Sequence, residues 1–247
     1  MRGGRIRQQG HDRALVIALA VLLAFGLMRL AGARPESFMS AQGTLGSAYL
    51  AFVGSNQATY LYVPLFAFCA ARFFRPLSSA MWLARSAGRA AALARLLPGL
   101  VARALTFSAA VLAPSLAALV LRSSLEPAPG QVVGFCLVQL AFETAFFVIC
   151  GLVYATSRLL TRSGALSLVL TVVYGASDTF VSSFDRAHDG TLWMGWMLMG
   201  QGDPASPVVA LAGILRLIAI ATLLYLIARR AVRSLDLLEA EPHHDAA

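Results

Sequence analysis

The sequence predicts an all-α integral membrane protein with six transmembrane helices, both termini in the cytoplasm, and a cytoplasmic interfacial helix between spans two and three. Of its 247 residues, 58% are hydrophobic and only 13% are charged, and the mean hydropathy is +0.72. A soluble domain typically has about 25% charged residues. The shortage of charge extends along the whole chain, so one soluble core cannot bury this much apolar surface and lipid must cover part of it.

Six apolar runs are long enough for a helix to cross about 30 Å of hydrocarbon. They lie at 14–33, 48–71, 99–121, 131–157, 164–183 and 207–228. The fifth run is the least regular, because Thr171, Ser177 and Asp178 interrupt it. Residues 1–233 therefore form a single transmembrane domain, and we expect 234–247 to be a disordered, acidic cytoplasmic tail.

The arginines give the direction of the spans, since short loops rich in positive charge stay in the cytoplasm. All 20 basic residues are arginine. The loops predicted to be cytoplasmic contain fourteen of them, at 2, 5, 7, 13, 72, 75, 85, 89, 95, 158, 162, 229, 230 and 233. The external loops contain only Arg34, Arg122 and Arg186. An even number of crossings follows, with both ends inside.

The N-terminal region allows a second interpretation. A basic start, an apolar run and Ala31-Gly32-Ala33 also resemble a secretory signal peptide with its cleavage site. Arg29 lies between the apolar run and these small residues. Its position favours a first helix that is retained.

The connection 72–98 is too long for a tight turn and too basic for a span. From 78 to 97 it consists mostly of strong helix formers, and the prolines at 76 and 98 separate it from the neighbouring spans. Trp82, Arg85, Arg89 and Arg95 make it amphipathic, with Arg85 and Arg89 on one face. We expect an interfacial helix, which carries either ordinary cytoplasmic charges or a docking surface for a partner.

The local sequence then resembles a known family. Arg75-Pro76-Leu77-Ser78-Ser79, the stretch from Trp82 to Arg89, and Ala94-Arg95-Leu96-Leu97-Pro98 are similar to the segment before the third helix of the small permease subunits of type-2 ABC exporters. The six-span layout resembles that family as well. The connection departs from the family pattern in having no acidic residue near its start.

This resemblance implies a transport subunit of the bacterial cytoplasmic membrane that moves a peptide, lipid-like or drug-like substrate. It implies two partners: a cytoplasmic ATP-binding subunit, docked on the segment containing Trp82, Arg85, Arg89 and Arg95, and a second permease half in a homo- or heterodimer. The chain has no GxxxxGK[ST] phosphate-binding loop. ATP hydrolysis is therefore expected on the partner.

Two charged residues lie deep within the predicted spans. Glu143 is in span four and Arg216 in span six, and a rise of about 1.5 Å per residue places them at comparable depth. A charge at the bilayer centre costs at least about 2.5 kcal/mol on insertion scales. We expect an intramembrane polar pair, which either fixes the packing of two helices or takes part in a substrate or proton path.

Other chemistry is poorly supported. No catalytic, cofactor-binding or metal-binding residues are predicted, because the three cysteines and four histidines have no ligand spacing and no histidine lies within a span. Copper(I) binding by Met194, Met197 and Met199 lacks a supporting Cys or His. Arginines confined to short loops do not form a nucleic-acid surface. An intramembrane enzyme is the least favoured class.

An alternative function is the six-helix substrate-binding subunit of an energy-coupling importer. Such a protein would present a face of small residues on its first span to a partner. Ala14, Ala18, Ala20, Ala24 and Gly26 are compatible with such a face.

Overall fold

The computed structural model describes residues 3–32, 57–78, 89–122, 129–184 and 207–234, and all regular structure within them is helical. The long helices are separated by segments outside the described residues, except between α8 and α9. In chain order the elements are α1 (Gly3–Gly32), the π-helix η1 (Ala58–Tyr62), α5 (Val63–Phe73), the 3₁₀ helix η2 (Arg75–Ser78), α7 (Arg89–Arg122), α8 (Pro129–Thr161), α9 (Gly164–Phe184) and α10 (Pro207–Ser234).

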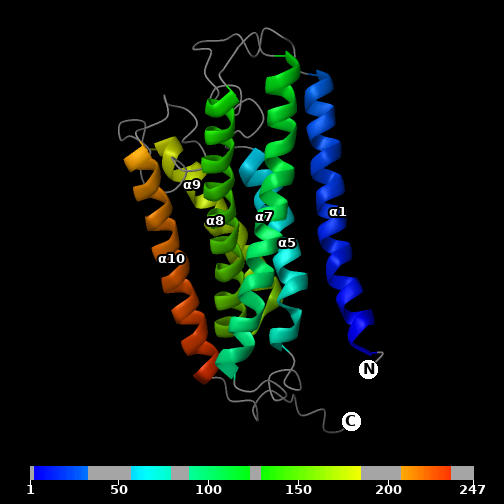
Figure 1. Ribbon diagram of the computed structural model, residues 1–247. Helices are drawn as coiled ribbons and strands as arrows, with labels where there is room; N and C mark the ends of the chain where they lie inside the picture. The colour runs from blue at the N-terminus through cyan, green and yellow to red at the C-terminus, as the bar shows by residue number, and fades with distance from the viewer. Residues whose placement is uncertain (1–2, 33–56, 79–88, 123–128, 185–206, 235–247) are drawn as a thin grey trace.

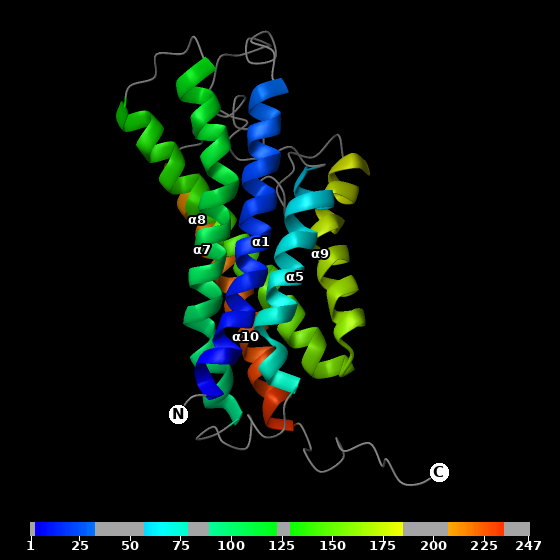
Figure 2. The same ribbon diagram turned by 90° about the vertical axis from the view of Figure 1, so that its right-hand side faces the viewer.

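The helices form an elongated bundle in which successive long helices run in alternating directions (Figures 1 and 2). The beginning of α1 and the end of α10 lie at the same end of the bundle, which we call the terminal end. Helix α8 is central and packs against α5, α7, α9 and α10, whereas α1 lies at one side against α5 and α7. Helices α5 and α8 both run toward the terminal end.

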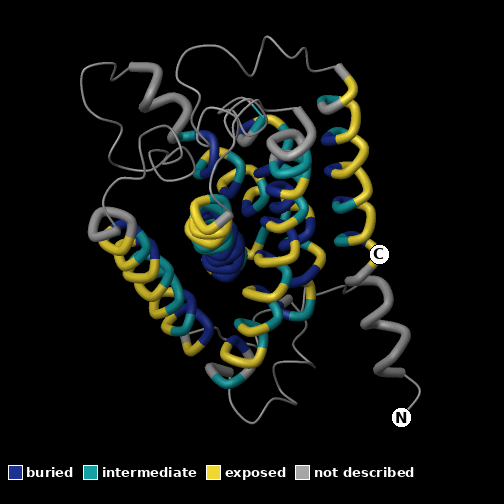
Figure 3. Tube along the Cα trace, turned by 45° about the horizontal axis from the view of Figure 1, so that its top comes forward, coloured by how far each residue is buried: buried dark blue, intermediate teal, exposed yellow. Residues whose placement is uncertain are grey.

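Apolar side chains cover much of the outer surface of the bundle. Leu27 on α1, Leu137 on α8 and Leu215 on α10 are each more than half exposed, and Figure 3 shows the exposed side of α1 turned away from the bundle. Three described stretches are long and apolar enough to cross a bilayer: Leu93–Pro114, Gly130–Thr161 and Leu211–Arg233. Such length and exposure indicate a membrane protein.

Helices occupy the described parts of all six predicted spans. Two of these parts, Thr59–Phe73 and Gly164–Ser177, are apolar but shorter than a full crossing. The structure therefore confirms the all-helical class. The tail 235–247 and the Trp- and Met-rich connection 185–206 lie outside the described residues.

The structure corrects one predicted boundary. Pro98 was expected to end a separate interfacial helix, but α7 begins at Arg89 and continues through Pro98 to Arg122. Proline removes one hydrogen bond, to the carbonyl four residues earlier. Here that carbonyl belongs to Ala94, so α7 continues through Pro98 with one backbone hydrogen bond fewer. Residues 89–97 are thus the first turns of α7, and 79–88 lie outside the described residues.

Two glycines allow α7 to approach the neighbouring helices α1 and α8 closely. A Cβ atom at Gly26 of α1 would overlap the Pro114 ring of α7, and one at Gly151 of α8 would overlap Leu100 of α7. Within a membrane, helices associate mainly through close van der Waals packing, which small residues permit. These contacts fix α1, α7 and α8 against one another.

A two-residue turn, Arg162 and Ser163, joins α8 to α9. Arg162 has a positive φ of 56°, the left-handed conformation that commonly ends a helix. The Arg158 side chain donates to the Arg162 carbonyl at 2.8 Å, and the Ser163 hydroxyl accepts from the backbone N–H of Leu166 at 3.3 Å. The turn thereby satisfies groups at the end of one helix and the start of the next.

Candidate functional site

Helix α8 presents different chemistry on two of its faces. Gln139, Glu143 and Phe147 are spaced four residues apart, so they share one face, and each is at most 2% exposed. Thr144 and Val148 belong to a neighbouring face that lines a groove. The two faces therefore border two separate candidate sites.

Three phenylalanine rings meet in the bundle interior, one each from α5, α7 and α8. The Phe66 and Phe147 centroids are 4.9 Å apart, Phe66 and Phe107 are 5.2 Å apart, and Phe107 and Phe147 are 4.8 Å apart. All three are at most 1% exposed. We call this cluster the aromatic floor.

Buried polar residues lie on the side of this floor away from the terminal end. Tyr62 and Glu143 each precede a floor residue by four positions, Phe66 and Phe147 respectively. Because α5 and α8 run in the same direction and their rings are in contact, both polar residues lie about one turn above the floor. Thr59 and Gln139 follow one turn further on.

We call Thr59, Tyr62, Gln139 and Glu143 the polar layer. None is more than 4% exposed, and Glu143 is completely buried. Glu143 of α8 and Arg29 of α1 both act electrostatically on Tyr62. Tyr62 is also the last residue of the π-helix η1, a local irregularity that frequently occurs at functional sites.

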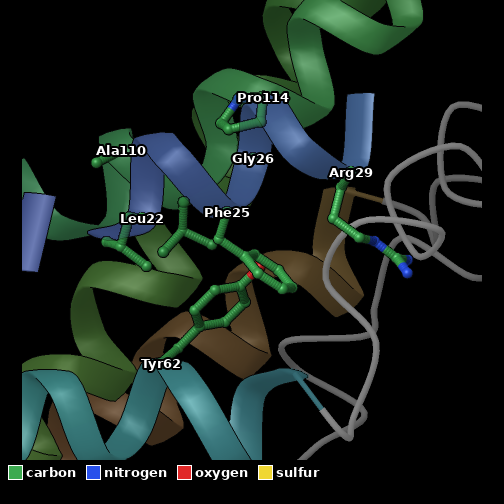
Figure 4. Close-up of a pocket in the computed structure, with 8 residues that line it drawn as sticks. Leu22, Phe25, Gly26, Arg29, Tyr62, Ala110 and Pro114 are labelled. Carbon is green, nitrogen blue, oxygen red and sulfur yellow. The ribbon is translucent and has the colours of Figure 1, made fainter. Parts of the chain in front are cut away.

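A cavity of about 10 Å³ lies beside Tyr62, between α1, η1 and α7. This volume is at the lower limit for holding one water molecule. In Figure 4, Phe25 and Tyr62 lie close together on one side, Pro114 lies beside Gly26, and the Arg29 guanidinium points away from the other labelled residues. The Phe25 and Tyr62 rings meet edge to face at 6.5 Å.

The second candidate site is a groove of about 550 Å³ between α7, α8 and α10. Its volume falls within the usual range for small-molecule sites, which are mostly apolar with a few polar groups. The polar groups here are Thr144, Thr222 and Tyr225. The Thr222 hydroxyl donates to the Ile218 carbonyl at 2.8 Å, whereas the buried Thr144 hydroxyl has no hydrogen-bond partner among the described residues.

The predicted intramembrane residues differ in burial. Glu143 is fully buried in the core, and Arg216 is exposed on α10. Phe142 and Ile149 of α8 pack against Leu217 of α10, while Glu143 lies on the face of α8 that meets α5. An ion pair between Glu143 and Arg216 stays a prediction.

The predicted docking residues are only partly described. Arg95 is exposed on α7. Arg89 is the first residue of α7, but its side chain is not described, and Trp82 and Arg85 lie outside the described residues. The docking role of all four stays a prediction.

Arg103 of α7 makes contacts within the bundle. Its guanidinium carbon lies 4.3 Å from the centroid of the Phe73 ring, and its Nη1 donates to the Gly99 carbonyl at 3.2 Å. A cation over an aromatic face is stabilising, more so where water is excluded. Arg103 therefore links α7 to the last residue of α5.

The small-residue face of α1 is used within the chain. Ala14, Ala18 and Gly26 are buried, whereas Ala20 and Ala24 are exposed. The Cys69 thiol of α5 lies 3.6 Å from the Ala14 carbonyl. This face packs against α5 and α7.

Comparison with known proteins identifies no relative. No protein-family model, curated protein or solved structure matches the chain. Among the described residues, no group of three or more His, Cys, Asp or Glu side chains could hold a metal ion.

Proposed function

We propose that this chain is the membrane permease subunit of an ABC-type exporter, which works with a separate cytoplasmic ATPase to move a lipid-like, drug-like or peptide substrate. In this proposal all six helical segments cross the membrane, and the terminal end faces the cytoplasm. The groove between α7, α8 and α10 is the observation that carries the proposal. Its size and apolar lining suit an amphipathic substrate.

The charge at the terminal end supports an ATPase there. Exposed arginines lie at this end: Arg72 in the last turn of α5 and Arg75 just after it, Arg95 in the first turns of α7, Arg162 between α8 and α9, and Arg230 near the end of α10. Complementary charge steers partners together and sets their orientation. A partner with an acidic docking surface would fit this end. Because Leu97 and Val101 of α7 line the groove, a movement of α7 caused by the docked partner would reach the groove.

Purification of the tagged full-length chain from its native membranes tests the partnership. The expected result is co-purification of a protein that contains a GxxxxGK[ST] loop. Changing Arg85→Glu and Arg89→Glu together should abolish this association. The matched control reverses two charges on the predicted external loops, Arg34→Glu and Arg186→Glu, and should leave the association intact.

Two outcomes would count against the proposal. If no such ATPase accompanies the chain, the exporter function fails. If the ATPase is retained by the Arg85/Arg89 variant, the docking role assigned to this segment is wrong.

The groove is tested separately by filling it. Ala145→Phe and Ala221→Phe place rings within the groove lining and should abolish substrate stimulation of the partner's ATP hydrolysis. Ala102→Phe adds the same ring at an exposed position of α7 and should have no effect. Unchanged stimulation in the filled variants would exclude the groove as the substrate site.

The importer subunit remains the alternative proposal. A subunit of this kind is expected to present a small-residue face of its first span to a partner. Three residues of that face are instead covered by α5 and α7. A vitamin-sized ligand that survives purification would favour this alternative over the exporter.

A further inference from the structure

We propose that the groove between α7, α8 and α10 binds a long-chain fatty acid, with the acyl chain parallel to the helices and the carboxylate at the terminal end. This inference names the substrate class of the groove, and in that respect it rests on the proposed function. It is carried by the order of the side chains along the groove and by the charge at its terminal end.

The relative height of α8 and α10 follows from two contacts. The Thr156 hydroxyl of α8 donates to the Leu224 carbonyl of α10 at 3.5 Å, and Ile149 of α8 packs with Leu217 of α10 in one buried cluster. In both pairs the α10 residue comes 68 positions later in the chain, and both helices run toward the terminal end (Figure 1). Each α10 residue therefore lies at about the height of the α8 residue 68 positions before it.

The polar lining residues mark out an aliphatic stretch of the groove. Thr144 lies on α8, Thr222 and Tyr225 lie on α10 nearer the terminal end, and every other lining residue is Ala, Val, Leu or Ile. Thr222 is level with Tyr154 of α8, so its distance from Thr144 along the bundle is about 15 Å at a rise of about 1.5 Å per residue. This is half of the ~30 Å hydrocarbon core, the depth that the acyl chains of one leaflet fill.

The groove is open toward the surrounding lipid. Leu105 of α7 and Ile218 of α10, which line it from different helices, are 45% and 51% exposed. An amphiphile dissolved in the bilayer can therefore enter sideways, because its chain stays in apolar surroundings throughout.

The terminal end of the groove carries positive charge. Tyr225 lines this end, and the half-buried Arg229 follows one turn later on the same face of α10. Among the described residues, α7 and α10 contain no Asp or Glu, and α8 contains only Glu143, which lies on its core face. A phenol and a guanidinium are hydrogen-bond donors that suit a carboxylate.

These features distinguish among substrate classes. A peptide would place backbone N–H and C=O groups beside aliphatic walls, where unsatisfied polar groups are costly. A cationic drug-like amphiphile would bring its positive charge close to the arginines of the terminal end, and such like-charge contacts are unfavourable. An acyl chain with a compact anionic headgroup avoids both costs.

Photo-cross-linking tests the proposal. The probe is palmitate with a diazirine in its acyl chain, added to the purified full-length protein in phosphatidylcholine vesicles at mildly alkaline pH, where the carboxylate is ionised. We expect cross-links on the α8 and α10 peptides that contain Val148 and Ile218. Unlabelled palmitate should displace the probe several-fold better than hexadecanol, hexadecylamine or lysophosphatidylcholine.

Two pairs of variants separate the acyl chain from the headgroup. Ala145→Phe combined with Ala221→Phe fills the groove and should abolish these cross-links, whereas Ala102→Phe, at an exposed position of α7, should retain them. Arg229→Gln should weaken displacement by palmitate several-fold and leave displacement by hexadecanol unchanged. Arg230→Gln removes the same charge from an exposed position one residue further around α10 and should leave both unchanged.

Cross-links that persist in the filled variant would overturn the proposal, as would equal displacement by palmitate and hexadecanol. Stronger displacement by hexadecylamine would assign the groove to cationic amphiphiles, and stronger displacement by lysophosphatidylcholine would assign it to phospholipids, so either result overturns the fatty-acid assignment. The experiment uses no ATPase, so fatty-acid binding can fail while the exporter function stands. Conversely, a chain that binds palmitate but brings down no ATPase would lose the exporter function and keep the binding site.

Discussion

Glu143 and Thr144 are neighbours on α8, yet they border different environments. Glu143 lies in a closed interior lined by aromatic rings and buried polar groups, whereas Thr144 lines an open groove walled by aliphatic side chains. The core face is fixed by tight contacts with α5 and α7. The groove face has room for a ligand. One helix can therefore border a closely packed interior and an open groove, provided that each face meets different neighbours.

The largest expected difference between the two faces is in packing. Phe147→Ala on the core face should lower the free energy of unfolding by up to about 3 kcal/mol, the lower end of the range for such truncations. The loss lies at the lower end because the ring stays in apolar lipid when the protein unfolds in a membrane. Mainly the loss of packing contacts then contributes to the change in stability.

Leu137→Ala, at a groove position 62% exposed, should change stability by no more than about 0.5 kcal/mol. Unfolding of the purified proteins by SDS measures both values. Equal losses would mean that the groove face is as tightly packed as the core.

The next largest effect concerns the glycine contact between α7 and α8. Gly151→Val would force a side chain against Leu100 and should cost about 1–3 kcal/mol, as overpacking typically does. Gly134→Val, at a helical position with nothing within 4 Å, is the matched control. The temperature at which the monodisperse protein is lost in detergent should be lower for Gly151→Val than for Gly134→Val. Equal destabilisation of the two variants would contradict the close approach of α7 and α8 at Gly151.

The smallest effect concerns two threonine hydroxyls. Thr171 on α9 is buried and donates to the Ser167 carbonyl at 2.7 Å, so Thr171→Val should cost about 1 kcal/mol. The Thr144 hydroxyl has no partner among the described residues, and Thr144→Val should be neutral or slightly stabilising. The same SDS titration compares them. A clear loss at Thr144 would mean that a group bound in the groove uses this hydroxyl.

Hydropathy predicted where the helices lie, because apolar length is a property of the chain alone. It also indicated Glu143, because a carboxylate in an apolar run is conspicuous without knowledge of its neighbours. Pro98 was misread as a boundary, since proline can lie inside a long helix when the surrounding packing holds the helix together, as at Pro98 and Pro114 of α7.

The remaining features of the two sites depend on which helices are neighbours. Tyr62 and Phe66 come from one segment and Glu143 and Phe147 from another, and only the packing of α5 on α8 places them together. The spacing of Gln139, Glu143 and Phe147 by four residues was the one available signal. The groove could not be predicted from the sequence, because leucine and valine that face a groove look the same in sequence as leucine and valine that face lipid.

The short connection between α8 and α9 has a consequence for how the chain enters the membrane. Helix α9 has the shorter apolar stretch, Gly164–Ser177, whereas α8 has one of 32 residues. With only Arg162 and Ser163 between them, α9 emerges from the ribosome already tied to a helix that partitions strongly into lipid. If both helices cross the membrane as proposed above, the pair would insert as a hairpin, and the arginines near its turn would hold that turn on the side of synthesis. A short apolar segment would then need no independent recognition by the insertion machinery.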